Sequence, residues 1–114
     1  MKKEGFPKEI RIKKKSEFEQ VTKKGKKIPG KNLILYKLDS NEKPQKFGIK
    51  LNRNFKGSVK RNRIKRLLRE ILRKNKERFK ENEQVLIFYR STSAEISYQE
   101  LLSEFENLVV QAFK

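Results

Sequence analysis

Four basic side chains recur at every fourth position in the middle of the chain. They are Arg61, Lys65, Arg69 and Arg73, with Asn62, Arg63 and Arg66 between them and Lys60 directly before them. Residues four apart share one side of a helix, so a helix here would carry a ridge of cationic groups. Arginine binds phosphate through two parallel hydrogen bonds, which makes phosphate recognition the chemistry indicated. A merely solvated helix face is the alternative, but only Glu70 interrupts the positive charge of this segment.

Aromatic side chains are the second set that could bind a ligand. Phe18 lies in an expected helix and Tyr36 in an expected strand. An exposed aromatic ring offers an unpaired nucleobase a surface for stacking. For these two residues, stacking and core packing are equally open. We expect core packing for three others, Phe47, Phe88 and Phe105.

The residue types used in most nucleophilic and acid–base catalysis are missing. The chain contains no His and no Cys, which excludes disulfides, thiolate or imidazole metal sites, and Ser-His-Asp or Cys-His catalysis. Glu100 and Glu104 lie one helical turn apart, a pattern more typical of a solvated helix face than of a metal site. No glycine-rich phosphate loop is present. We therefore expect no catalytic residue and no metal ligand in this chain.

Positive charge is concentrated in the first two thirds of the sequence. The 114 residues carry 31 Lys and Arg against 14 Asp and Glu, a net charge of +17. Residues 1–45 carry +8, residues 46–80 carry +13 and residues 81–114 carry −4. Such repulsion within one small domain is relieved by a polyanionic partner, of which nucleic acid is the usual one. Because no apolar run approaches the roughly 20 residues that cross a bilayer and no secretory signal is present, we expect a cytoplasmic protein without a membrane partner.

The elements that must position these groups follow from local patterns. Residues 1–15 predict a basic arm, with a short extended piece at Ile10–Ile12. A capping box at Ser16 to Glu19 predicts a helix that stops at Gly25. Alternating apolar residues predict strands over 33–38 and 47–51. The sequence between them, Asp39 to Pro44, predicts a hairpin-like loop.

The second half of the chain predicts two amphipathic helices around one buried strand. Ser58 is a good N-cap for a helix that runs to about residue 79, with an apolar stripe from Ile64 to Leu72. The continuous apolar run over 85–89 is typical of a central strand. A second capping box, Ser97 to Glu100, begins the last helix. The chain is thus expected to form a single α+β domain over 1–114, a small sandwich with the order αββαβα.

The run from Gly57 to Glu70 closely resembles the signature of the bacterial ribonuclease P protein subunit. Arg61-Asn62-Arg63, then Lys65, Arg66 and Arg69, resemble the "RNR" helix of that family. The similarity extends in pattern over about residues 9–113. Its supporting matches are Phe18 and Gly25 in the first helix, Leu33, Leu35 and Tyr36 in the first strand, and Phe47-Gly48 in the second.

The resemblance implies both a fold and a function. The fold is the ribonuclease P protein-like sandwich, also found in a ribosomal protein domain, with a left-handed βαβ crossover. The function is that of the protein subunit of ribonuclease P, which cleaves the 5′ leader from precursor tRNA. The resemblance also implies that a catalytic RNA does the chemistry with magnesium, held mainly by the RNA and the substrate, and that one protein joins one RNA.

Roles for individual residues are carried over by position. Phe18, Tyr36 and Arg53 resemble the residues that contact the single-stranded leader. A second group resembles the motif that faces the RNA, namely Lys60, Arg61, Asn62, Arg63, Lys65, Arg66 and Arg69. Two positions depart from the family pattern: Thr22 stands where a second aromatic is common, and Asn54 where a second basic residue is common.

Three other functions stay open on the sequence alone. A general RNA- or DNA-binding module, such as a ribosomal protein, would bind without preference for a leader. A protein nuclease acting alone would need its carboxylates to bind metal. An amphipathic helix lying on a membrane surface fits the basic face, but Ile64 to Leu72 are better used in a core that has few other candidates.

Overall fold

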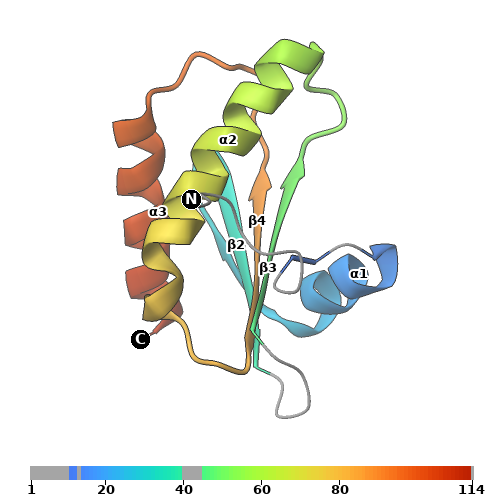
Figure 1. Ribbon diagram of the computed structural model, residues 1–114, viewed down its shortest axis with the longest axis vertical. Helices are drawn as coiled ribbons and strands as arrows, with labels where there is room; N and C mark the ends of the chain where they lie inside the picture. Colours follow the sequence, from blue (N-terminus) through green and yellow to red (C-terminus); the bar gives the residue numbers. More distant parts are fainter. Residues whose placement is uncertain (1–10, 13, 40–44, 114) are drawn as a thin grey trace, which may run out of the picture.

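The helices and strands follow one another along the chain in an order that fits an α+β protein. The computed structural model describes residues 11, 12, 14–39 and 45–113 (Figure 1). The helices in this part of the chain are α1 (Lys15–Lys24), α2 (Ser58–Asn75), a 3-10 turn η2 (Lys76–Arg78) and α3 (Tyr98–Ala112). The strands are β1 (Lys26–Pro29), β2 (Leu33–Asp39), β3 (Lys46–Leu51) and β4 (Glu83–Tyr89). The predicted order αββαβα is confirmed, with the short β1 added.

The four strands form one mixed sheet in the order β1-β2-β4-β3. β2 is antiparallel to β1 and to β4, whereas β3 is parallel to β4. The central place predicted for the apolar run over 85–89 is confirmed. The two parallel strands are joined through α2, which makes a βαβ unit; its left-handed sense stays a prediction from the family resemblance.

The predicted hairpin-like connection after β2 is wrong. β2 and β3 follow each other in the sequence, but β4 lies between them in the sheet. A hairpin requires adjacent strands, and here the adjacent position is taken by a strand from later in the chain. Residues 40–44 of the connection lie outside the described residues.

The main core lies between the sheet and the helices α2 and α3. Figure 1 shows these two helices on one side of the sheet and α1 on the other. Ile64, Leu68 and Ile71 of α2 are buried in this core, as the predicted apolar stripe requires. Phe105 of α3 is also buried, with its ring centre 6.4 Å from that of Phe79.

Two predicted helix caps are wrong, and one is confirmed. α1 begins one residue before Ser16, and the amide of Lys14 donates to the Glu17 carboxylate over 3.3 Å. α2 is capped by Gly57 instead of Ser58, with φ at +97°. That backbone region favours glycine. At α3 the capping box is present: the Ser97 amide donates to Glu100 at 3.0 Å, and the Glu100 amide donates to the Ser97 hydroxyl at 3.1 Å.

α2 is shorter than the sequence predicts. The helix ends at Asn75 and continues as the 3-10 turn η2 instead of reaching residue 79 as an α-helix. The side chain of Asn75 donates to the carbonyl of Ile71 over 2.7 Å. Asparagine competes in this way for backbone groups and is a common helix terminator.

The predicted stop of α1 at Gly25 is confirmed, and the strand that follows it was not predicted. The Gly25 amide donates to the Val21 carbonyl at 2.9 Å. A Cβ at this position would stand 2.5 Å from the Val21 oxygen and 2.9 Å from the Lys37 oxygen. Glycine therefore lets the chain turn directly from α1 into the edge strand β1, which buries only Ile28.

The extended piece predicted before α1 is present where the structure describes it. Arg11 forms a parallel bridge with Phe47. The Ile12 amide donates to the Phe47 carbonyl over 2.8 Å, and the Ile12 side chain is buried. This segment therefore extends the sheet beyond β3. The rest of the predicted arm, apart from the start of α1, lies outside the described residues.

Candidate nucleic-acid interface

One face of the sheet is only half covered by a helix. α1 packs over the row in which Leu86 of β4 lies between Tyr36 of β2 and Gly48 of β3. Figure 1 shows α1 over one end of this face. The next row in register contains Ile34, Phe88 and Lys50. We use the name open face for five residues on this side of the sheet: Phe18, Ile34, Tyr36, Lys50 and Phe88.

Phe18 projects from α1 onto the sheet and packs closely against it. Its ring atom Cε1 lies 3.0 Å from the position that a Cβ on Gly48 would take, so this strand needs a glycine for α1 to approach. Phe18 and Tyr36 are both half-buried and pack against a small cluster that includes Val21 and Leu86. Each side chain is therefore packed in part and exposed in part, and stacking on a nucleobase stays a prediction.

A surface hollow lies beside the Phe18 ring. It is lined by Lys15, Phe18, Glu19, Thr22 and Lys50, so it lies between α1 and β3. The Thr22 hydroxyl donates to the Glu19 carbonyl of its own helix over 3.0 Å. The hollow thus offers a flat apolar ring with lysine side chains next to it, which suits a planar base attached to a phosphate.

Phe88 belongs to this face, although the sequence predicted it as a core residue. It is half-buried and lies in register between Ile34 and the exposed Lys50. The continuous apolar run of β4 hid the alternation of its two faces. In β3, the alternation of residues does indicate a more polar face, because Gly48 and Lys50 point to the same side. The pairing of Lys50 with Phe88 then places Phe88 on that side of the sheet.

Arg53 lies exposed in the turn between β3 and α2. The neighbouring Asn52 fixes this turn from both sides. Its side-chain amide donates to the Arg90 carbonyl over 2.8 Å, and its side-chain oxygen accepts from the Asn54 amide over 2.9 Å. Arg53 is therefore presented to solvent by a turn that is tied to the end of β4.

Arg61 and Arg63 tie the first turns of α2 to the loops on its two sides. The Nη1 atom of Arg61 donates to the carbonyl groups of Asn52 and Phe55, at 3.0 and 2.8 Å. Arg63 donates to the carbonyl groups of Ala94 and Ile96, at 2.8 and 3.0 Å. Hydrogen bonds from a charged donor are among the stronger ones in proteins. In both residues, some of the guanidinium N–H groups thus hold a neighbouring loop in place.

The loop after β4 accepts a hydrogen bond from Tyr89 in addition to the two from Arg63. Tyr89 is buried, and its hydroxyl donates to the Ser93 carbonyl. Burial raises the pKa of Tyr89, so the hydroxyl keeps its proton and stays a donor. Together with Arg63, this contact fixes the loop that begins at Arg90.

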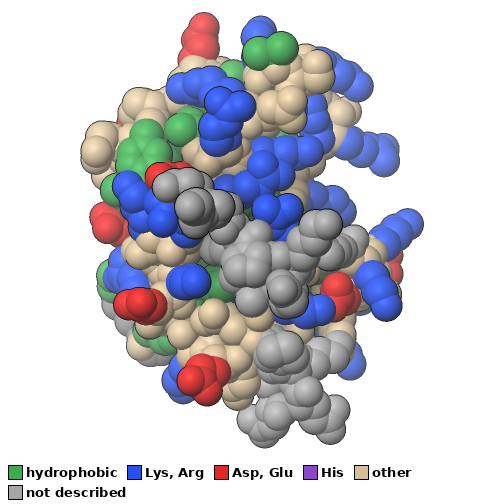
Figure 2. Space-filling model, viewed as in Figure 1, with side chains coloured by type: hydrophobic (Ala, Val, Ile, Leu, Met, Phe, Trp, Pro, Cys, Tyr) green, Lys and Arg blue, Asp and Glu red, His purple; other side chains and the backbone are tan. Residues whose placement is uncertain are grey.

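The other cations of α2 are more accessible. Lys60, Asn62, Arg66 and Arg69 are exposed, and Lys65 is half-buried. The cationic ridge predicted at positions 61, 65, 69 and 73 therefore does not lie wholly on the solvent-facing side of α2. Part of it lies on the side of the helix that faces β3. Figure 2 shows Lys and Arg side chains gathered over α2 and along the notch that separates it from α1.

Comparison with known proteins places this arrangement in a family. The family model for ribonuclease P matches residues 6–112 of the chain. The chain belongs to the ribonuclease P protein family. Its relatives include the ribonuclease P protein component of Bacillus cereus strain AH187, 35% identical over 95 residues, which cover 82% of this chain and 83% of the relative. The corresponding protein of Bacillus pumilus is 28% identical over 99 residues, which cover 86% of this chain and 83% of the relative.

Solved structures of ribonuclease P proteins share the fold. The Staphylococcus aureus protein has a TM-score of 0.79 and 22% identity, covering 92% of this chain and 98% of its own. The Thermotoga maritima protein has a TM-score of 0.75 and 21% identity, covering 89% and 96%. The α+β fold inferred from the sequence is therefore confirmed. As a ribonuclease P protein component, the chain belongs to bacterial tRNA processing and has an RNA partner.

The open face of this ribonuclease P protein does not fit a magnesium ion. Mg²⁺ prefers carboxylate and other hard oxygen ligands, whereas this face presents aromatic rings and Lys50. Within residues 11, 12, 14–39 and 45–113, no group of three His, Cys, Asp or Glu side chains is placed to hold a metal. Nor does this described part of the chain contain a helix long and apolar enough to span a membrane.

Proposed function

We propose that this chain is the subunit that binds the catalytic RNA of ribonuclease P together with the single-stranded 5′ leader of precursor tRNA. The observation that carries the proposal is that two surfaces both border β3, on opposite sides of the sheet: the open face with its half-exposed rings, and α2 with its exposed cations. Aromatic rings stack on unpaired bases of any identity, and cations bind the phosphates of folded RNA. These two surfaces together suit a complex in which a single-stranded segment extends from a folded RNA.

The open face binds the leader. Phe18 and Tyr36 stack on its bases with their exposed sides, since their other sides are fixed by packing around Leu86. Lys50 lies in the same face and neutralises the leader's phosphates. Arg53, on the turn that follows β3, contacts the strand where it approaches the cleavage site.

The basic helix binds the catalytic RNA. Lys60, Asn62, Lys65, Arg66 and Arg69 contact its phosphates directly. Arg61 and Arg63 use the donors left over from their bonds to the flanking loops. Neutralised phosphates reduce the repulsion between catalytic RNA and substrate, so the complex needs less magnesium.

The RNA carries the chemistry, one protein serves one RNA, and the complex acts in the cytoplasm. The absence of His and Cys from the sequence supports this division of labour. So does the donor set of the open face, which suits bases and phosphates better than Mg²⁺.

The test is cleavage of a precursor tRNA by a bacterial ribonuclease P RNA at low magnesium, with and without this protein. The expected result is correct 5′ cleavage only when the RNA and the protein are combined. Cleavage by the protein alone would overturn the division of labour. Binding to RNA without any effect on cleavage, with a compatible catalytic RNA, would favour a general RNA-binding module instead.

A salt titration of the same complex tests the electrostatic part. The logarithm of the binding constant should fall linearly with the logarithm of salt concentration, by about 0.7–0.9 for each phosphate contact. A response that is flat with salt would contradict binding through the cations of α2.

A further inference from the structure

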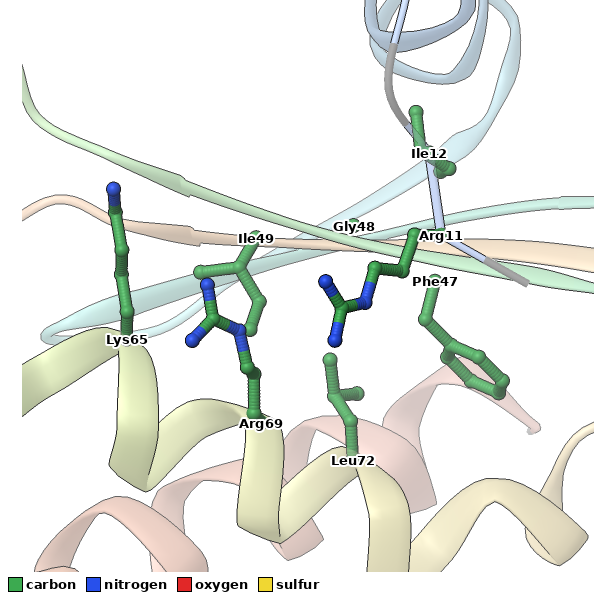
Figure 3. A pocket seen from close by; sticks show the side chains of 8 residues that line it. All are labelled: Arg11, Ile12, Phe47, Gly48, Ile49, Lys65, Arg69 and Leu72. Carbon is green, nitrogen blue, oxygen red and sulfur yellow. The ribbon is translucent and has the colours of Figure 1, made fainter. Parts of the chain in front are cut away.

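A hollow lies on each side of β3, and the two hollows differ in the charges that line them. In the pocket on the side of α2, shown in Figure 3, the charged residues among the described lining are all cations, namely Arg11, Lys65 and Arg69. That pocket is part of the basic surface already described. The hollow on the side of α1 differs because Glu19 lines it together with Lys15 and Lys50. Its volume of about 340 Å³ lies at the lower end of the range for small-ligand sites, roughly 300–1,000 Å³.

One side of α1 forms the wall of this second hollow. Its four lining residues stand at positions i, i+3, i+4 and i+7, which share one side of a helix: Lys15, Phe18, Glu19 and Thr22. This side faces β3, where Lys50 completes the lining. The Thr22 hydroxyl donates to the Glu19 carbonyl of its own helix over 3.0 Å. The small Thr22 side chain therefore leaves the space between helix and strand open.

The groups around the hollow match the three parts of a nucleotide. The half-buried ring of Phe18 offers a surface on which the flat face of a base can stack. Lys15 and Lys50 are exposed beside it and can bind the phosphates. Glu19 is the one described lining residue with a carboxylate, so it can meet the edge of the base as a charged acceptor.

The Glu19 carboxylate is available to accept hydrogen bonds. Its side chain is exposed, and it forms no ion pair within the part of the chain that the structure describes. The other carboxylate of α1 differs in this respect, since Glu17 pairs with Lys46 at 2.8 Å. Hydrogen bonds to an ionised acceptor are stronger than those between neutral groups. Glu19 can therefore discriminate between bases by the N–H donors that they present.

Guanine is the base that such an acceptor fits best. Its Watson–Crick edge carries two adjacent donors, the N1–H and the exocyclic amino group, and the two oxygens of one carboxylate can accept from both. Adenine and cytosine each present an amino group beside a ring nitrogen that is itself an acceptor. The single N–H of uracil lies between two carbonyl oxygens, which a carboxylate repels. Because single-stranded RNA is read on these edges, the expected order has guanine first and uracil last.

We propose that Glu19 is a specificity-determining residue, which makes the hollow beside Phe18 selective for a guanine base of the single-stranded leader. The inference rests on the proposed function, because it requires that the leader crosses the open face. It adds a base preference to a surface whose ring and lysines would bind any sequence.

The test varies one base at a time. Each of the four bases is placed in turn at every position of a short leader, and the dissociation constant of each precursor tRNA is measured for the assembled complex of this protein and ribonuclease P RNA. At one leader position, the wild type should bind the guanine form roughly five- to ten-fold more tightly than the uracil form. Absence of a guanine preference at every position would overturn the inference.

Glu19→Gln is the decisive variant because it keeps the size of the side chain and replaces one acceptor oxygen by a donor. Loss of a negative charge strengthens binding of every RNA, so the quantity compared is the ratio between the guanine and uracil forms. This ratio should fall most of the way to one. Glu106→Gln is the matched control, since it removes the same charge from an exposed position of α3 and should keep the wild-type ratio. An unchanged ratio in Glu19→Gln, or an equal fall in the control, would contradict the assignment.

Two further variants test the geometry of the hollow. Glu19→Asp keeps the charge on a shorter side chain and should show a ratio between those of the wild type and Glu19→Gln. Thr22→Phe fills the hollow with a ring and should remove the guanine preference although Glu19 is intact. A full guanine preference in Thr22→Phe would show that the base does not enter this hollow.

Mature tRNA, which lacks the leader, separates failure of this inference from failure of the proposed function. If precursor tRNA binds more tightly than mature tRNA but no base preference depends on Glu19, leader binding stands and the guanine site falls. If the two forms bind equally, leader binding itself falls, and the guanine site falls with it.

Discussion

The two faces of the sheet differ in what covers them. On one face, β4 lies under α2 and α3, and Ile87 and Phe105 are at most 1% exposed. On the other, α1 packs over the rows of Leu86 and Leu38, and Tyr36 and Phe88 stay half-buried beside the exposed Lys50. A strand with a continuous apolar run, such as β4, is typical of one that is covered on both faces. The difference shows that the side chains of Tyr36 and Phe88 keep exposed surface on this face, whereas Ile87 and Phe105 on the other face have almost none.

Charge is divided between the two helices that cover the packed face. α3 lies in the acidic last third of the chain, whereas α2 and the turn at Arg53 belong to the basic middle third. The half-covered face and the exposed cations of α2 both border β3, so under the proposed function an RNA contacts the molecule around this edge of the sheet. The packed face supplies the stability that lets the other face stay open.

The same change made on the two faces should have the largest effect on the packed one. Phe105→Ala removes a fully buried ring and should cost about 3–5 kcal/mol of unfolding free energy. Phe88→Ala removes a half-exposed ring and should cost less than about 1 kcal/mol. Urea unfolding of both variants measures the difference. Equal losses would show that the open face is a second core.

The second prediction tests what the open face binds. Tyr36→Ala should weaken binding of precursor tRNA to the assembled complex by about 1–3 kcal/mol, roughly 5- to 150-fold, and leave mature tRNA nearly unchanged. Tyr36→Phe keeps the ring and should bind both forms like wild type. Tyr98→Ala, on α3, is the control from the opposite side. If Tyr36→Ala weakens both tRNA forms equally, the open face does not bind the leader.

The third prediction sharpens the comparison within α2. Arg61 donates to two carbonyl groups, whereas Arg66 is exposed. Lysine cannot reproduce the planar fork of arginine. Arg61→Lys should therefore destabilise the fold by about 1 kcal/mol, while Arg66→Lys should leave the urea midpoint within error of wild type. A loss of the same size in both variants would mean that the bonds of Arg61 to the loop contribute nothing.

The smallest effect concerns the cap of α3. The hydrogen bond from the Ser97 backbone, followed by that from its side chain, lowers the pKa of Glu100 from its ordinary value of 4.5. A carboxyl group whose pKa is lower in the folded than in the unfolded state stabilises the fold at pH values above its ordinary pKa. This stabilisation is lost as the pH falls through the pKa of the folded state. Glu100→Gln should thus reduce stability at pH 7 more than at pH 3. Glu106→Gln, on the same helix, should show a smaller difference between the two pH values.

The elements with strong local signals were predictable from the sequence. The apolar stripe of α2, the uninterrupted run of β4 and the reciprocal cap of α3 each need only neighbouring residues to be recognised. β1 was missed because a four-residue strand with one buried side chain has no periodicity to detect. The cap of α2 was misassigned because Ser58 is a favoured cap type, whereas Gly57 acts through a backbone angle that composition does not reveal.

The site depended more on tertiary structure. The residues that the family resemblance names do lie in described elements, but their surroundings follow from pairing. Phe88 joins the open face only through the register of β4 with β2 and β3. Arg63 bonds to a loop more than 30 residues away in the sequence, and Arg61 to the turn that precedes its own helix. Arg11 reaches α2 only because its segment extends the edge of β3, a contact that no local pattern predicts.

Site-specific crosslinking tests the central claim most directly. The chain has no Cys, so Lys50→Cys on the open face and Val110→Cys on the exposed side of α3 each give one attachment point for a photoreactive group. Both proteins are assembled with ribonuclease P RNA and a precursor tRNA labelled in its leader. Crosslinks to the leader from position 50 and none from position 110 are the predicted result. Equal crosslinking from both positions, or from position 110 alone, would contradict a leader bound on the open face.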